Sequence, residues 1–253
     1  MLHKSVVILP ALVLTLLLPI GVQAQPYQDA PYSDEQLYAA YQAGDMQTWK
    51  EYIDHACFDS LTTQEQTRRV YYEYGYAAAL LDIDKRAARP YIRQFGEHIE
   101  ALKNDLPPVL LHVYTVAFHT YDMAANARHI KMHCDQILLH AEQAVQADST
   151  HPLAWGIQAN VHFYAPRLMG GNKQLAMREY ERADSLFEMH ARDHELDWTY
   201  MAQTVSLVQC YDKLGLKDKA LAKARQAAAR WQRFDYMKQY LQELEKKTNN
   251  NNH

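Results

Sequence analysis

Residues 211–227 have the sequence YDKLGLKDKALAKARQA, and this stretch decides the fold class. Ala220, Ala224 and Ala227 are spaced by four and then three residues, so they lie on one face of a helix. Gly215 lies just before this helix, at a position where glycine commonly ends a preceding one. The stretch therefore predicts a hairpin of two helices that approach closely through small side chains.

The same spacing recurs upstream, which indicates an internal repeat. Ala176, Tyr180 and Ala183 reproduce it most clearly. Two weaker units are marked by Gly75, Ala87 and Tyr91, and by Ala141 and Ala144. The chain is therefore expected to contain several related helix hairpins.

Helix start and stop signals divide most of the chain into about eleven helices. The sequence has only 8 glycines and 9 prolines among 253 residues, too few for an all-β fold rich in turns. Capping boxes at Ser33-x-x-Gln36 and Thr62-x-x-Glu65 mark two of the helix starts. The predicted helices cover about 33–44, 45–57, 62–80, 84–103, 107–121, 127–146, 152–164, 173–191, 197–213, 217–230 and 232–246.

The repeated residues resemble the tetratricopeptide repeat (TPR), a pair of antiparallel helices with small residues at its close contacts. The match is best in the units around Ala176 and Ala220 and extends over about residues 60–247. The resemblance implies an all-α fold, a right-handed superhelical stack of TPR-like helix hairpins around one core. It also implies a binding or scaffold protein that recognises a protein, a peptide or a small ligand in a concave groove.

A second resemblance lies in the long turn at residues 164–176, YAPRLMGGNKQLA. It is similar to a turn in exported bacterial TPR-like proteins, including periplasmic helical proteins associated with TRAP-type transporters. This similarity implies an alternative function, as a ligand-binding or adaptor subunit of a transport system. Within the same turn, Gly170 to Lys173 opens a helix whose N-terminus could hold an anion. The simpler interpretation is a turn in which Asn172 caps the helix.

The first 24 residues have the features of a secretory signal peptide. A basic start is followed by an apolar run at 6–20, and Val22 and Ala24 suit a cleavage site before Gln25. The run is shorter than the ~20 residues of a membrane-spanning helix, although an N-terminal anchor is the alternative. We therefore expect a periplasmic or secreted protein with no membrane span after cleavage.

The expected domain organisation follows from these boundaries. After the leader (1–24), residues 25–32 form a linker, 33–247 form one α-helical repeat domain, and the polar tail 248–253 is expected to be disordered. The net charge of −4 argues against a nucleic-acid partner. The three cysteines, Cys57, Cys134 and Cys210, are expected to be small buried side chains, and whether two of them form a disulfide stays open.

The sequence contains no familiar catalytic motif, so we expect neither an enzyme nor a bound cofactor or metal. Two histidine pairs, His129/His133 and His190/His194, have the i, i+4 spacing that could place two metal ligands on one helix face. Exposed helix histidines are the favoured interpretation of both pairs. An enzyme or metal-binding protein remains the third hypothesis.

Aromatic residues supply the candidate binding surface, because the chain contains 18 tyrosines. Tyrosine combines a flat apolar ring with a hydroxyl, which suits a groove for a peptide or an apolar ligand. In the TPR register, the first helix of each hairpin lines the concave surface. The alternative is that these side chains fill gaps between helices. The register nominates Tyr72, Tyr76, Tyr114, Phe118, Tyr121, Asn160, Phe163, Tyr164 and Gln209.

Overall fold

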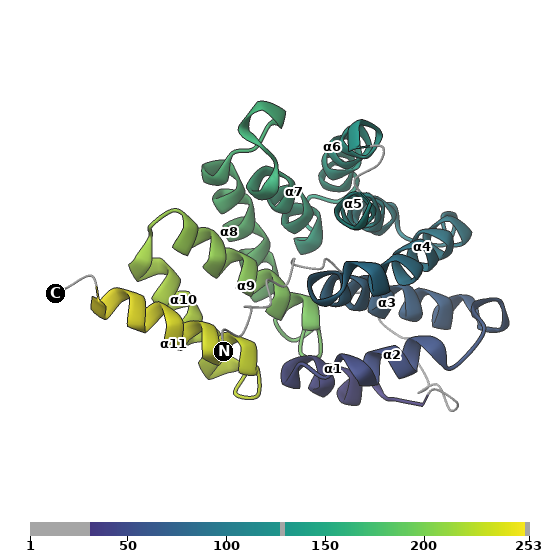
Figure 1. Ribbon diagram of the computed structural model, residues 1–253, viewed down its shortest axis with the longest axis horizontal. Helices are drawn as coiled ribbons and strands as arrows, with labels where there is room; N and C mark the ends of the chain where they lie inside the picture. The colour runs from purple at the N-terminus through teal and green to yellow at the C-terminus, as the bar shows by residue number, and fades with distance from the viewer. Residues whose placement is uncertain (1–30, 127–129, 251–253) are drawn as a thin grey trace.

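The computed structural model describes residues 31–126 and 130–250, which form helices joined by short connections, with no strand in those ranges (Figure 1). The expected all-α class is confirmed. The predicted leader, the cleavage site before Gln25 and His129 lie outside the described residues. The helices are α1 (Asp34–Ala43), α2 (Met46–Asp54), η1 (Phe58–Ser60), α3 (Thr63–Ile83), α4 (Lys85–Ala101), α5 (Pro108–Ala125), α6 (Ile130–Ala147), α7 (Pro152–Tyr164), η2 (Arg167–Met169), α8 (Lys173–Met189), α9 (Trp198–Lys213), α10 (Lys217–Arg230) and α11 (Asp235–Asn250).

Local signals in the sequence set most of these helix ends. Ser33 and Thr62 form the two predicted capping boxes, at the starts of α1 and α3. Gly44 and Gly215 adopt the left-handed conformation, with φ of 71° and 74°, directly after α1 and after the end of α9. Several ends differ from the predicted ranges by a few residues, and the predicted start of the tail at 248 was wrong, because α11 continues to Asn250.

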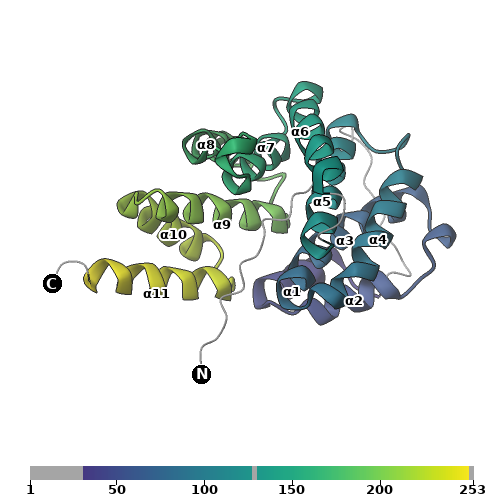
Figure 2. The ribbon, with the colours of Figure 1, turned by 45° about the horizontal axis from the view of Figure 1, so that its top comes forward.

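Consecutive helices pack as pairs along much of their length: α3 with α4, α5 with α6, α7 with α8, and α9 with α10. Figure 2 shows the second half of the chain as successive layers, with α7 and α8 above α9 and α10, and α11 below them. The first helix, α1, also contacts α9 and α11, so the two ends of the helical array touch.

Small residues lie at the helix contacts, as the repeat pattern predicts. Ala176, Ala220 and Ala224 are fully buried. The register predicted for α4 was wrong, because Ala88 is buried whereas Ala87 is exposed. Asp84 caps α4 through the amides of Arg86 and Ala87, and the helix then turns Ala88 inward together with the apolar side chains that follow it.

The centre of the fold contains a cluster of large aromatic side chains that we call the aromatic hub. It comprises Tyr41, Tyr74, Tyr114, Tyr121 and Trp198, contributed by α1, α3, α5 and α9, and none of them is more than 6% exposed. Tyr74 touches three of the others, with ring centroids 5.5 to 6.0 Å apart. The hub therefore joins helices from both halves of the chain.

The three cysteines occupy different environments and are not bonded to one another. Cys210 is buried, Cys134 is half-buried and Cys57 is exposed, so the expectation of three buried thiols holds for Cys210, is met only in part by Cys134 and was wrong for Cys57. Cys57 lies in the short connection before η1, outside the helix contacts. Among the described residues, no helix is both long and apolar enough to span a bilayer.

Candidate functional site

An apolar pocket lies between α5, α6, α7 and the turn at η2, and we call it the α5–α7 pocket. Its volume is about 250 Å³. None of the described residues that line it carries a charge. They are Tyr74, Val116, Ala117, Thr120, Tyr121, Met123, Ile130, Cys134, Ile137, Leu138, Ile157, Asn160, Val161, Tyr164, Ala165, Pro166 and Met169.

Helical periodicity brings these side chains to the pocket. On α6, Ile130, Cys134 and Ile137 are spaced by four and three residues and share one face. On α7, Ile157 and Tyr164 lie two turns apart on one face, and the α5 residues repeat the pattern.

A few polar groups interrupt the apolar wall. The Oδ1 of Asn160 accepts a hydrogen bond of 2.6 Å from the hydroxyl of Tyr180, which holds the amide in place. Thr120 and Tyr164 add hydroxyls, and Cys134 Sγ lies 3.8 Å from Met123 Sδ. Although Tyr164 is 42% exposed, desolvation by the surrounding side chains raises the pKa of its hydroxyl above the usual value of about 10, and the group is protonated at neutral pH.

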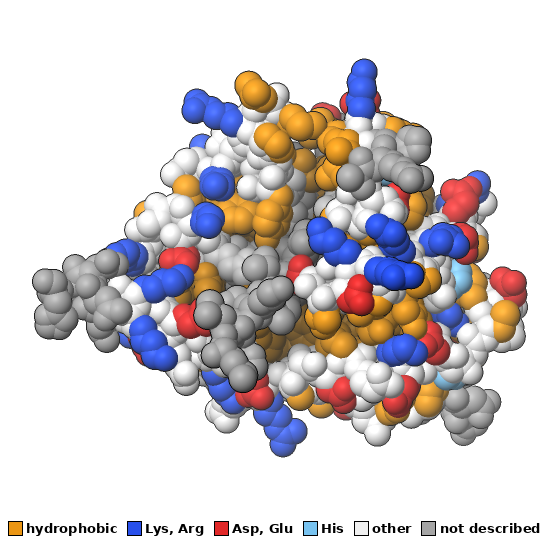
Figure 3. Space-filling view, viewed as in Figure 1, with side chains coloured by type: hydrophobic (Ala, Val, Ile, Leu, Met, Phe, Trp, Pro, Cys, Tyr) orange, Lys and Arg blue, Asp and Glu red, His pale blue; other side chains and the backbone are white. Residues whose placement is uncertain are grey.

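Exposed apolar side chains surround the mouth of the pocket. Ile130, Leu138, Tyr164 and Met169 line the pocket and are still 41–48% exposed. Leu168, in the η2 turn, is fully exposed. In Figure 3, hydrophobic side chains gather between the turn after α7 and helix α6. Such a concentration of exposed apolar surface is typical of an interaction site.

The turn at residues 164–176 builds one side of this mouth. Its glycines are required: Gly170 has φ of 90°, and a Cβ on Gly171 would lie 1.9 Å from the carbonyl oxygen of Ala165. The side chain of Asn172 accepts from the amides of Gln174 and Leu175, so it caps α8. The turn-and-cap interpretation accounts for this geometry.

Three of the nine predicted binding residues, Tyr121, Asn160 and Tyr164, line the α5–α7 pocket. Tyr72, Tyr76 and Tyr114 do not lie in an open groove, because they are 2%, 5% and 0% exposed. The prediction failed because the first helices of the pairs are covered on more than one side: α3 packs against α2, α4 and α5.

The contacts of the buried tyrosines show their packing role. The ring of Tyr72 meets Trp49 edge to face, and its hydroxyl donates to Asp34 Oδ1 at 2.9 Å. Tyr76 packs against Tyr91 with ring centroids 4.9 Å apart.

The three remaining predicted residues also lie away from the pocket. Phe118 is half-buried and lies over Gly96, where a Cβ would come within 2.4 Å of the ring. Phe163 packs against Tyr180, and Gln209 Nε2 donates to the hydroxyl of Tyr236 at 3.1 Å. The nine residues therefore do not form a single surface. The α5–α7 pocket, which three of them line, is the candidate binding site.

Of the two histidine pairs, only His190/His194 lies wholly within the described residues, since His129 does not. His190 and His194 lie mostly in a turn after α8, and His194 is buried with its Nδ1 2.8 Å from Asp197 Oδ2. The expectation of exposed helix histidines was therefore wrong for His194, and also for His133, which is 3% exposed on α6. In the described ranges, no group of three or more His, Cys, Asp or Glu side chains could hold a metal ion.

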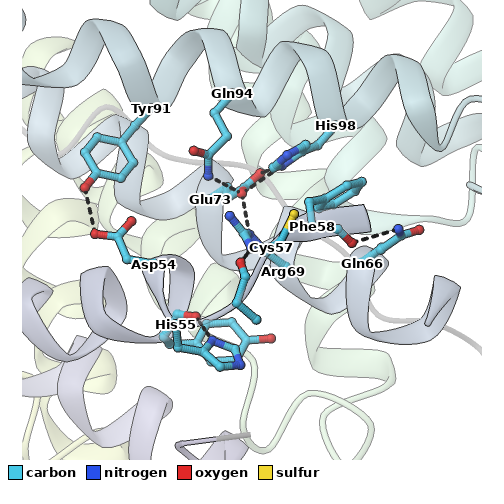
Figure 4. Close-up of polar contacts among 12 residues, drawn as sticks. Asp54, His55, Cys57, Phe58, Gln66, Arg69, Glu73, Tyr91, Gln94 and His98 are labelled. Carbon is cyan, nitrogen blue, oxygen red and sulfur yellow. Dashed lines mark hydrogen bonds and ion pairs between the residues drawn. The ribbon is translucent and has the colours of Figure 1, made fainter. Parts of the chain in front are cut away.

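A buried polar cluster between α3 and α4 was not predicted (Figure 4). Glu73 is 2% exposed, and its carboxylate accepts from Arg69 Nε at 2.9 Å and from Gln94 Nε2 at 2.8 Å. His98 Nδ1 lies 2.8 Å from the other carboxylate oxygen, and its ring is stacked on Phe58. All three neighbouring side chains contact the carboxylate of Glu73. The cluster is therefore best explained as a structural contact that stabilises the packing of α3 against α4. The only sequence signal was the i, i+4 pair of Arg69 and Glu73.

Comparison of the chain with protein-family models, with curated proteins and with solved structures gives no match.

Proposed function

We propose that this protein is an exported, non-enzymatic binding protein whose site is the α5–α7 pocket. The ligand is a small, uncharged and mainly apolar molecule. One observation carries this proposal. None of the described residues that line the pocket is charged, and exposed apolar side chains surround its mouth. Export rests on the leader at residues 1–24, and the repeat pattern supports a TPR-like superhelical stack as the scaffold.

The size of the pocket limits the ligand. An apolar cavity of about 150 Å³ can hold a benzene molecule. A cavity of about 250 Å³ therefore suits a two-ring molecule, a short acyl chain or one large apolar side chain of a partner protein. A long peptide does not fit inside it, so a protein partner would insert a single anchor.

A ligand-binding subunit of a transport system is the second candidate. The pocket lies between helices, and the turn that resembles those of transporter-associated proteins forms part of its mouth. The uncharged wall favours a neutral solute over an organic acid, because a buried carboxylate needs a charged or strongly donating partner.

A binding experiment with a neutral fluorescent probe, N-phenyl-1-naphthylamine, tests the proposal. Val161 lines the pocket and is only half-buried, so Val161→Trp should place an indole in the cavity without disrupting the core. Met189→Trp is the matched control, because Met189 is 66% exposed and does not line the pocket. We expect Val161→Trp to weaken probe binding at least about tenfold, a change of about 1.4 kcal/mol, and Met189→Trp to leave it unchanged.

Two results would contradict the proposal. The wild-type chain could fail to bind the probe at all, or the two variants could bind it equally well. Either result would mean that the α5–α7 pocket is not the binding site.

A further inference from the structure

Two members of the aromatic hub, Tyr74 and Tyr121, line the α5–α7 pocket with their side chains almost fully buried. They are 0% and 2% exposed, and their rings stack with centroids 6.0 Å apart and an interplanar angle of 19°. Neither hydroxyl has a hydrogen-bond partner of normal geometry among the described residues. The buried wall of an apolar pocket therefore carries two hydroxyls that have, among the described residues, no hydrogen-bond partner outside their own pair.

Such groups are costly, because a buried tyrosine hydroxyl normally finds a partner. The two hydroxyls lie near enough to act on each other, and Tyr74 could direct its O–H toward Tyr121. A single shared bond of this kind still leaves the O–H of Tyr121 without an acceptor. A molecule that occupies the pocket is well placed to supply that acceptor.

We propose that Tyr121, assisted by Tyr74, recognises a neutral oxygen atom of the ligand, so that the pocket selects apolar molecules that carry one hydroxyl or carbonyl group. This inference rests on the proposed function and adds the ligand class. The apolar part of the ligand contacts the side chains of α6 and α7, and its oxygen reaches the tyrosines on α3 and α5.

The electrostatic surroundings favour a neutral group over an anion. Burial raises the pKa of Tyr121 well above its usual value; the hydroxyl of Tyr74 opposes this shift, and the carboxylate of Asp82 adds to it. Tyr121 is therefore a hydrogen-bond donor at neutral pH. A carboxylate or phosphate brought to the same place would find no cation in the described pocket wall.

The test compares two probes of nearly equal shape, 2-naphthol and 2-methylnaphthalene. The methyl compound is the more hydrophobic, so a purely apolar pocket binds it at least as tightly. We expect the wild-type chain to prefer 2-naphthol by about fivefold, the contribution of one hydrogen bond. Tyr121→Phe should abolish that preference and leave the affinity for 2-methylnaphthalene unchanged.

Tyr114→Phe is the matched control variant. Tyr114 is fully buried in the same hub and its hydroxyl also has no partner in the described part of the chain, but it does not line the pocket. It should therefore keep the preference for 2-naphthol. In the absence of ligand, Tyr121→Phe removes a buried O–H that lacks an acceptor among the described residues, but it also removes the oxygen toward which Tyr74 can point, so its melting temperature should stay close to that of wild type.

The outcomes separate this inference from the proposed function. If the wild-type chain binds both probes equally, or if Tyr121→Phe retains the preference, the inference is overturned and the apolar pocket stands. If neither probe binds, the proposed function is overturned as well. Loss of the preference in Tyr121→Phe together with weaker binding of 2-methylnaphthalene would assign Tyr121 a role in shaping the pocket and overturn the inference.

Discussion

Trp49 and Trp198 meet edge to face on the side of α3 where Gly75 leaves room for both, with ring centroids 5.1 Å apart. Trp49 comes from α2 and Trp198 from the start of α9, so this contact joins distant parts of the chain. A glycine is needed in the middle of a long helix because both indoles rest on its backbone.

The first prediction concerns Gly75→Ala. In most helices this change stabilises the protein by about 0.5–1 kcal/mol. Here the new Cβ would lie 2.5 Å from Trp49 Cζ3 and 2.7 Å from Trp198 Cη2. We expect the free energy of unfolding to fall by about 1–3 kcal/mol, measured by urea denaturation. A more stable variant would show that the two indoles do not pack against this position.

The second prediction concerns pH. His119 Nδ1 lies 3.0 Å from His133 Nδ1, and His112 Nδ1 lies 2.8 Å from His140 Nδ1, so two histidine pairs bridge α5 and α6. Burial, with repulsion from His133 and His140, lowers the pKa of His119 to about 4. Burial also lowers the pKa of His112 and of His140.

The sign of the effect follows from proton uptake. Between pH of about 6.5 and 4, the unfolded chain binds protons at these histidines that the folded chain does not. The free energy of unfolding should therefore fall as the pH falls through this window, with His119 contributing about 1–2 kcal/mol after allowance for solvent screening. Urea denaturation at the two ends of the window measures the drop. His119→Gln should show a smaller drop than wild type, and an equal drop would exclude His119 as its source.

The third prediction concerns the cluster in Figure 4. Glu73→Ala removes the partner of Arg69, which is 5% exposed, and leaves a buried charge uncompensated. We expect a loss of about 3–5 kcal/mol in the free energy of unfolding. Glu97→Ala is the control, because Glu97 is an exposed residue of α4 and its removal should change stability by less than about 0.5 kcal/mol. Similar melting temperatures for the two variants would contradict the role assigned to Glu73.

The fourth prediction distinguishes the two registers of α4. Ala88→Leu should overpack a fully buried position and cost about 1–3 kcal/mol, whereas Ala87→Leu should be nearly neutral because Ala87 is exposed. Thermal denaturation of the two variants side by side gives the answer. If Ala87→Leu were the less stable variant, the register predicted from the repeat pattern would be supported instead.

Helix positions were predictable from the sequence because their signals are local. Side chains such as Ser33, Thr62 and Asn172 satisfy backbone amides two or three residues away, so a capping residue marks its own helix end. Ala176 and Ala220 were predictable for a related reason, since their spacing with other small residues follows the helical period. Ala87 was misplaced because neighbouring alanines leave the phase of α4 undecided by one residue.

The site was only partly predictable. The repeat register assigns the first helix of each hairpin to the binding surface. This assignment correctly nominated three residues that line the pocket: Tyr121, Asn160 and Tyr164. The α6 residues that complete the pocket, such as Ile130 and Ile137, look like any amphipathic helix face, and nothing local shows that the face is left partly uncovered. The failure for Tyr72 and Tyr114 has the same cause, because the number of helices covering a face depends on distant segments.

Contact of α1 with α9 and α11 gives the array the connectivity of a ring. In a linear array the end units have one neighbour each and fray first. Here α1 packs against α9 and α11, so the helices at both ends of the described array have an additional packing partner. Unfolding is therefore not expected to begin at either end. Hydrogen exchange should consequently show α1 protected to nearly the same degree as α9, and deletion of α11 should lower protection in α1 as well as in its sequence neighbour α10.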